Sequence, residues 1–240
     1  MYDSPASKIR ATLKSAADPT LAPAMQAYMK SAMPFLGVPA PARRQIVRDA
    51  VRAHPCRSGD ELAQLVRSLW RDATHRELRY AALDLFRMGP HRRLLTIELL
   101  PLARELLADA TWWDLNDELS GVLLPALLQD GPATMKALLR TWARGADLWE
   151  RRAAMLTQRK LDGDAFDAVL FYDCLLPSVG DAALGREFFI CKGIGWALRE
   201  RSYAAPDEVQ AFCREYADRL SPLTRREALK ALRRTGVAAM

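Results

Sequence analysis

Leucine dominates the aliphatic residues of this 240-residue chain and outnumbers isoleucine and valine together by more than two to one. No stretch of strand length alternates polar with apolar residues, and β-branched residues are the ones that favour strands. The chain is therefore predicted to be all-α. After a helix that begins near Pro39 or Pro41, apolar spacing and end signals predict helices at residues 59–71, 75–88, 91–109, 112–129, 132–144, 148–160, 164–176, 182–201, 206–219 and 222–235.

A weak internal period of about 35 to 40 residues runs through these helices. It emerges when small or polar residues of corresponding helices are aligned: Gln45, Ala81, Asp117, Ala153, Gly193 and Ala228. Successive helix pairs at this period are typical of HEAT-like repeats, in which each pair contacts its neighbours and the second helices line a concave surface. We therefore predict a HEAT-like α-solenoid that forms a single domain over residues 1–240.

Basic residues recur on the helices that share this period. They are Arg43, Arg44, Arg76, Arg79, Arg151, Arg152, Lys192, Arg199, Arg225, Arg226 and Lys230. Any one of them is more simply a solvated residue of a helix face. Their recurrence, with tryptophans between them, favours a track for a phosphate-lined polymer and hence a concave DNA-binding face.

Composition favours an anionic partner and no cofactor. The 35 Lys and Arg against 29 Asp and Glu give a net charge of +6 and a pI near 9.3. The four cysteines are widely spaced and the three histidines have no metal-ligand spacing, so we expect reduced thiols and no metal. No apolar run approaches the ~18 residues of a membrane span, so a soluble cytoplasmic protein is expected.

The segment TWWDLNDELS, residues 111–120, combines two tryptophans with two acids. In a helix, Trp113 and Asp117 are four apart and share one face, whereas Trp112 points about 100° away. An exposed aromatic face beside an anion suits a planar, cationic ligand. The alternative is that the tryptophans belong to the core and that Asp114, in the first turn, interacts favourably with the helix dipole.

Several polar residues are predicted to begin helices. The expected N-caps are Ser4, Asp18, Ser58, Thr74, Thr111, Asp147 and Thr224. The first two precede a proline at the first helical position, and the others precede an acid three residues later, as in a capping box.

Longer motifs resemble one known family. They are AYMKSAMPFLGV from residue 27, RYAALDLF from 79, TWWDLND from 111, LWERRAAML from 148, REFFICKGIGWALRE from 186 and LSPLTRREALK from 220. In this order they are similar to the bacterial AlkD-like alkylpurine DNA glycosylases, which are HEAT-like enzymes of base excision repair. The sequence departs from the family pattern at Asn116, Gly193 and Arg201.

The resemblance implies a monofunctional glycosylase that releases cationic N3- or N7-alkylated purines, such as 3-methyladenine and 7-methylguanine, from duplex DNA. It places Trp113, Asp117 and Trp196 in the lesion-facing cleft, with Tyr28 as a further aromatic nearby. It also implies that Arg152 contacts the DNA backbone. We expect the basic track to add Arg43, Arg44, Lys192, Arg199, Arg225 and Arg226 as DNA-binding residues. A monomer associated with the nucleoid is expected.

The chemistry is consistent with these residues. An alkylated purine is already cationic, so the leaving base needs no strong acid, and Asp117 is the candidate to stabilise the sugar cation and orient water. Lys192 as a Schiff-base nucleophile is a weaker alternative, because a phosphate contact explains it equally well. Two other functions stay open: a non-catalytic DNA-binding member of the same fold, and a repeat scaffold for another protein.

Overall fold

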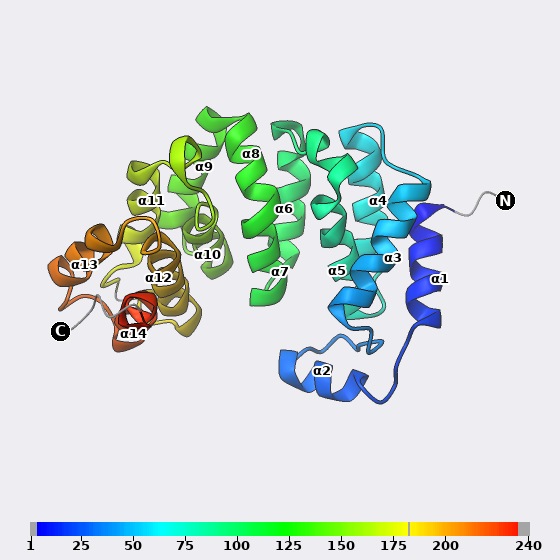
Figure 1. The fold of residues 1–240 in the computed structure, drawn as a ribbon, viewed down its shortest axis with the longest axis horizontal. Helices are drawn as coiled ribbons and strands as arrows, with labels where there is room; N and C mark the ends of the chain where they lie inside the picture. Colours follow the sequence, from blue (N-terminus) through cyan, green and yellow to red (C-terminus); the bar gives the residue numbers. More distant parts are fainter. Residues whose placement is uncertain (1–3, 182, 235–240) are drawn as a thin grey trace. The chain divides into compact units, whose positions relative to one another are not determined.

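The computed structural model describes residues 4–181 and 183–234, and every regular element in these ranges is helical (Figure 1). This confirms the all-α, helical-repeat prediction. Residue 235, the expected end of the last helix, lies outside the described residues. Contacts divide the chain into two compact units, unit 1 (Met1–Leu102) and unit 2 (Ala103–Met240). Each is described by itself, and the single domain and its concave face stay predictions.

Unit 1 is a layered packing of short helices. Its elements are α1 (Pro5–Ser15), α2 (Ala22–Met29), α3 (Ala40–Ala53), α4 (Gly59–Arg71), α5 (Arg76–Asp84) and the 3-10 turns η1 (Leu85–Arg87), η2 (Gly89–Leu94) and η3 (Ile97–Leu99). Helix α3 packs between α1 and α5, and α4 packs against α5 and α1 (Figure 1). Leu62, Val66 and Leu69 recur at helical spacing on α4, and their complete burial anchors that helix in the core.

The boundary between the units falls within α6 (Leu100–Asp109). Unit 2 continues with α7 (Trp113–Glu118), η4 (Leu119–Leu123), α8 (Leu124–Asp130), α9 (Pro132–Arg144), α10 (Leu148–Leu156), η5 (Gly163–Ala165), α11 (Ala168–Leu175), η6 (Leu176–Ser178), α12 (Phe188–Arg201), α13 (Pro206–Glu215), α14 (Pro222–Ala228) and α15 (Lys230–Arg234). The predicted helices 59–71 and 132–144 match α4 and α9 residue for residue.

Unit 2 has the repeat arrangement that the period predicts. Helices α7, α10, α12 and α14 pack on one another in series, while α8, α9 and α11 form a second series beside them (Figure 1). Asp117, Ala153, Gly193 and Ala228 lie on these four helices of the first series. One hydrophobic core cluster of unit 2 includes Met155, Phe171, Ile194, Leu198 and Phe212.

Three of the predicted N-caps are confirmed. The side chains of Ser4, Ser58 and Asp147 accept backbone N–H bonds at the first turns of α1, α4 and α10. A side-chain oxygen at this position satisfies N–H groups that have no partner within the helix. These three helices begin where the cap residue predicts.

The other four caps are wrong, because tertiary contacts use the residues differently. Asp18 accepts from Thr20 within a turn, and α2 begins later, at Ala22. Ser221 caps α14 in place of Thr224. Helices α5 and α7 follow His75 and Trp112, neither of which makes a side-chain cap bond. Thr74 and Thr111 are therefore not caps.

Glu77 explains why the capping box at Thr74 fails. Its fully buried carboxylate accepts hydrogen bonds from the backbone N–H groups of Leu36, Gly37 and Val38, at 2.9 to 3.2 Å. The acid therefore holds the loop before α3 and does not reach back to its own helix start. Local spacing cannot predict a contact of this sequence separation.

The predicted helix 112–129 is interrupted by a π-helical turn, η4. Pro125 has no N–H and so cannot donate to the carbonyl of Gly121, four residues earlier. The N–H of Leu124 bonds instead to the carbonyl of Leu119, five residues earlier. The turn ends α7 just after Asp117.

Candidate active site

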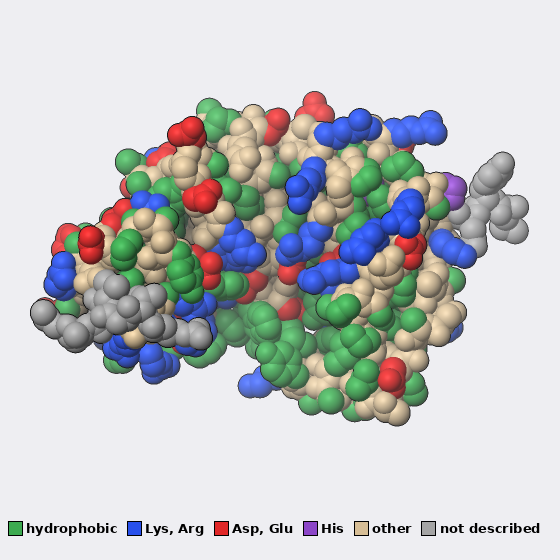
Figure 2. Space-filling view, viewed as in Figure 1, with side chains coloured by type: hydrophobic (Ala, Val, Ile, Leu, Met, Phe, Trp, Pro, Cys, Tyr) green, Lys and Arg blue, Asp and Glu red, His purple; other side chains and the backbone are tan. Residues whose placement is uncertain are grey.

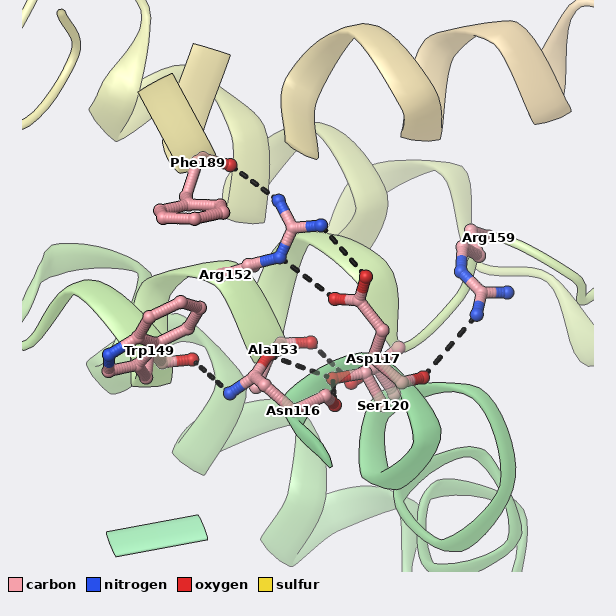
Figure 3. Close-up of polar contacts among 9 residues, drawn as sticks. Asn116, Asp117, Ser120, Trp149, Arg152, Ala153, Arg159 and Phe189 are labelled. Atoms are coloured by element: carbon pink, nitrogen blue, oxygen red, sulfur yellow. Dashed lines mark hydrogen bonds and ion pairs between the residues drawn. The ribbon is translucent and has the colours of Figure 1, made fainter. Parts of the chain in front are cut away.

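The acid of the TWWDLNDELS segment is held by an arginine from a neighbouring helix. Arg152, on α10, donates from Nε to Oδ1 of Asp117 at 2.8 Å and from Nη2 to Oδ2 at 2.9 Å (Figure 3). Its Nη1 donates to the carbonyl of Phe189 at the start of α12. One guanidinium therefore ties three helices together, in the two-bond geometry that best fits a carboxylate.

A second arginine lies on the other side of the acid. Arg159, just after α10, donates from Nη2 to the Asp117 carbonyl at 3.4 Å (Figure 3). Its guanidinium lies 4.2 Å from the ring centroid of Trp196. Its Nε and Nη1 are buried and have no hydrogen-bond partner among the described residues. Arg159 thus connects Asp117 to Trp196 and keeps unused donors beside the acid.

Burial dominates the electrostatics of this cluster. It raises the pKa of Asp117 above its ordinary value, and the hydrogen bond and charge of Arg152 oppose that rise. Burial also lowers the pKa of Arg159, against the attraction of Asp117. Further acids act on the same groups, Asp114 on Asp117 and both Glu118 and Glu200 on Arg159, so nearby carboxylates offset the positive charge of the two guanidinium groups.

Two glycines make room for the arginines. A Cβ at Gly121 would lie 2.7 Å from Nη2 of Arg159, and a Cβ at Gly193 would lie 3.2 Å from Nη1 of Arg152. Helix α12 runs unbroken through Gly193. Gly193, which departs from the family pattern, therefore leaves room for Arg152 to pack against α12.

Asn116, another departure, is fully buried and fastens α7 to α10. Its Nδ2 donates to the carbonyl of Trp149 at 3.0 Å, and its own carbonyl accepts from the hydroxyl of Ser120 at 2.7 Å (Figure 3). The polar side chain therefore has partners in the core, and it fixes the helix that carries Asp117.

The tryptophans divide between core and site. Trp70 and Trp142 are buried core residues. Trp112 and Trp149 pack with Phe189, with ring centroids 5.1 to 6.2 Å apart. Trp113, on α7, and Trp196, on α12, are half-buried. Trp196 also donates from Nε1 to Glu200.

One expectation about the site is wrong. The sequence predicts Asp117 beside an exposed aromatic face, but the residue is only 9% exposed, because Arg152 covers its carboxylate. Arg152 itself is 3% exposed and is directed to Asp117. In this state neither side chain is open to a DNA backbone.

The basic track is also corrected. Arg43 is buried in an ion pair with Asp84, 2.7 Å from Nε to Oδ2, and it faces the ring of Tyr80, so its role is structural. Arg76 is buried as well, and so is Arg151, which pairs with Asp181. Arginines buried in a repeat core need acidic partners, and these partners lie far away in the sequence.

Lys192 and Arg199 share one carboxylate. Nζ of Lys192 and Nη1 of Arg199 each lie 2.9 Å from an oxygen of Glu227, on α14. The hydrogen bond from Lys192 is the largest cause that lowers the pKa of Glu227. Arg225 and Arg226, on the same helix, are exposed. This group of unit 2 side chains retains a net positive charge.

The remaining predicted DNA-binding residues, Tyr28 and Arg44, lie in unit 1. Tyr28, at the end of α2, is 75% exposed. The side chain of Arg44 is about two-fifths exposed, and its Nε lies 3.3 Å from Asp84. Both are therefore accessible to a partner.

Sequence reasoning misses Arg159, Glu227 and the carbonyl of Phe189 as parts of the site. Arg159 follows the end of α10, where no periodicity assigns it a face, and the spacing of Glu227 from Thr224 predicts only a cap. The sequence signal that was available is Gly121 itself, since a glycine on a packed helix leaves room for a large side chain from a neighbouring segment, here Arg159.

The described residues offer neither a metal cluster nor a membrane span. No group of three or more His, Cys, Asp or Glu side chains among them is arranged to hold a metal ion. None of the helices built from these residues is both long and apolar enough to cross a bilayer.

Known proteins resemble the chain over most of its length. A family model described as "DNA alkylation repair enzyme" matches residues 9–232. The chain belongs to this family. A solved structure described as a predicted DNA alkylation repair enzyme from Enterococcus faecalis is similar, with a TM-score of 0.77 and 26% identity, over 90% of this chain and 96% of that one. No curated protein matches.

Membership in the DNA alkylation repair enzyme family confirms the resemblance seen in the sequence motifs. It also gives the coarse function, a role in the repair of alkylated DNA. The cluster around Asp117 lies within the matched residues, on the helices that the quoted motifs form.

Proposed function

We propose that this protein is a monofunctional DNA glycosylase that hydrolyses the N-glycosidic bond of cationic N3- and N7-alkylated purines in duplex DNA. The observation that supports the proposal is the cluster of Asp117, Arg152, Arg159 and Trp196. In this cluster Arg152 fixes the Asp117 carboxylate, and Arg159 bonds to the Asp117 carbonyl and also faces the indole of Trp196. The arrangement has the parts that the reaction needs.

Alkylation leaves a positive charge on the purine, so the bond between C1′ and the base nitrogen is weakened before the enzyme acts. When that bond breaks, its electron pair neutralises the base and the positive charge moves to the sugar. Asp117 stabilises this sugar cation electrostatically and orients a water molecule, whose oxygen bonds to C1′. The proton released by the water goes to the carboxylate and then to solvent.

The contact between Arg159 and Trp196 supports cation recognition. The guanidinium that lies 4.2 Å from the ring is a planar cation, as an alkylated purine is, so the same indole face suits both. Trp113 offers a second π face from the helix that carries Asp117. Each face contributes about 0.5 to 2 kcal/mol when water is excluded.

Arg152 is proposed to move between two anions. With no DNA bound it neutralises Asp117, and a phosphate of the damaged nucleotide competes for the same guanidinium. Once Arg152 binds the phosphate, the carboxylate regains the charge that the sugar cation requires. Tyr28, Arg44, Lys192, Arg199, Arg225 and Arg226 are proposed as further DNA contacts. We expect the protein to act as a monomer on chromosomal DNA in the cytoplasm.

Product analysis tests the proposal. Duplex DNA treated with a methylating agent should yield free 7-methylguanine and 3-methyladenine and should retain abasic sites in unbroken strands. Borohydride should trap no covalent adduct, because Lys192 pairs with Glu227 and is not assigned as a nucleophile. A trapped adduct that disappears in Lys192→Ala would contradict the monofunctional assignment.

A non-catalytic DNA-binding protein is the second candidate, favoured by the closed state of Asp117. Such a protein would bind methylated duplex with the salt dependence of phosphate contacts and release no base at any protein concentration. Release by the wild-type protein excludes it.

A further inference from the structure

Unit 1 contains a pocket of about 1010 Å³ with an unusual lining. Its basic members are Arg44, Arg48, Arg52, Arg57, Arg87, Arg92 and Arg93. Among the described residues that line it there is neither an acid nor a lysine. Figure 2 shows basic side chains gathered over α3, which forms one wall. We call this site the arginine pocket.

One wall is a regular row of cations. Arg44, Arg48 and Arg52 lie four residues apart on α3, so they share one face of the helix. Each step of four residues rises about 6 Å, and the row is about 12 Å long. Like charges at this spacing destabilise an isolated helix, so a bound anion would stabilise the arrangement.

Residues from other segments complete the lining. Exposed Arg57, Arg92 and Arg93 come from the loop after α3 and from η2. Buried Cys56 and Met88 contribute apolar surface to the lining. The lining therefore combines cations from α3, from the loop after it and from η2 with apolar surface.

Three carboxylates lie near these arginines, and one of them, Glu61, accepts the backbone N–H of Arg57 at 2.8 Å. Asp84 lies 3.3 Å from Nε of Arg44 but is shared with Arg43, and Asp49 lies 3.8 Å from Arg52. The side chain of Arg48 donates to a neutral partner, Gln45. Even with Arg87 left aside, six arginines outnumber these three carboxylates, so the pocket keeps a net positive charge.

A buried histidine joins two segments of the lining. Nε2 of His91 accepts the N–H of Cys56 at 3.2 Å, which leaves Nδ1 to donate to the carbonyl of Leu85 at 3.0 Å. This pattern requires a neutral ring. It ties the loop that carries Arg57 to the segment that carries Arg92 and Arg93, so the lining is preorganised.

We propose that the arginine pocket binds the phosphodiester backbone of one nucleic-acid strand, independently of base sequence. The guanidinium fork suits phosphate, and a row of about 12 Å spans three or four phosphates of one strand of a duplex, in which each strand carries one phosphate per ~3.4 Å of helix axis. A linear polyanion fits better than a single ion. The choice of nucleic acid as the polymer rests on the proposed function.

The test measures the binding of fluorescent dodecathymidylate by anisotropy over a range of salt concentrations. Arg48→Gln/Arg52→Gln and Arg57→Gln/Arg92→Gln each remove two cations from the pocket. Lys8→Gln/Lys14→Gln is the matched control, because it removes two cations from exposed positions on α1 of the same unit. All substituted residues are exposed, and thermal unfolding verifies that each variant is folded.

Each pocket variant should lower the salt slope by about 1.4, which is about 0.7 for each of two phosphates that the variant no longer neutralises on a single strand. At 0.1 M salt this corresponds to about 25-fold weaker binding. The control should bind like the wild type. Pocket variants that match the control would overturn the proposal. The proposal would also be overturned if polyglutamate or inorganic triphosphate displaced the labelled strand as effectively as unlabelled dodecathymidylate does, at equal concentrations of negative charge.

The binding test of the arginine pocket can fail or succeed independently of the proposed glycosylase function. Dodecathymidylate contains no purine, so its binding does not depend on base release. Weaker binding of the strand by the pocket variants, together with intact excision, would support the pocket. Absent excision with strand binding that still depends on the pocket arginines would refute only the glycosylase assignment.

Discussion

Asp117→Asn should destabilise the protein severely, because it removes the carboxylate that pairs with a buried guanidinium. Arg152 is 3% exposed and makes two charge-assisted bonds to the Asp117 carboxylate. Asparagine can accept one of them, but its amide group then faces an N–H of Arg152, and Arg159 adds a second cation nearby. Breaking a buried pair in this way costs about 3 to 5 kcal/mol.

The double variant Asp117→Asn/Arg152→Met should be more stable than Asp117→Asn, since it removes both charges and keeps the volume. Arg152→Met alone leaves the carboxyl buried, and burial already raises its pKa. The carboxyl can then take up a proton in the folded state, so the destabilisation of this variant should be smaller at pH 5 than at pH 8. The cycle should give a coupling energy of about 2 to 3 kcal/mol.

Urea unfolding followed by circular dichroism measures all four proteins, with equal slopes required for comparison. Asp173→Asn is the matched control, because Arg140 and Asp173 form a pair of similar length, 2.7 Å, that is about one-third exposed. It should cost less than about 1 kcal/mol. Additive effects of the two substitutions, or an Asp117→Asn effect no larger than that of the control, would refute the burial argument.

Two further predictions concern single side chains. Burial lowers the pKa of His91, so the unfolded chain takes up a proton below about pH 6.5 that the folded chain does not. The free energy of unfolding should therefore fall with pH from that value downward, and His91→Gln should flatten this slope; equal slopes would contradict it. Gly193→Ala should slow base release, because the new Cβ, 3.2 Å from Nη1 of Arg152, displaces that side chain. The melting temperature should change little, because alanine raises the helix propensity of α12 by up to about 1 kcal/mol and this gain offsets the clash. Gly59→Ala, whose Cβ meets only ordinary contacts, is the control, and equal rates for the two variants would refute the clash.

The helices are predictable where local signals decide them. Ser58 and Asp147 begin α4 and α10 because their side chains accept from the first turn of the helix that follows. Glu77 and Thr224 have capping spacing but serve partners about 40 and 33 residues away. Local spacing carries no information about such distant acceptors.

The sequence predicts which residues belong to the site, but it does not predict how they pair with one another. The four-residue spacing of Trp113 and Asp117 predicts that they share one face, and the motifs indicate Trp196 and Arg152. That Arg152 covers Asp117, and that Arg43 pairs with Asp84, depends on how neighbouring helices pack. From the sequence alone, an arginine on a helix is predicted to be solvent-exposed, because its acidic partner on another repeat cannot be identified.

The most direct measurement is the single-turnover rate of 7-methylguanine release from methylated duplex by Asp117→Asn and by Asp114→Asn. Both acids lie on α7 and are equally exposed, so the comparison isolates the carboxylate that faces Arg152. Both variants are assayed where circular dichroism confirms native helix content and anisotropy confirms DNA binding. We predict a rate about 10² to 10³-fold below that of the wild type for Asp117→Asn and a rate near that of the wild type for Asp114→Asn. Equal rates for the two variants, or no release by the wild type, would contradict the assignment of Asp117 as the catalytic carboxylate.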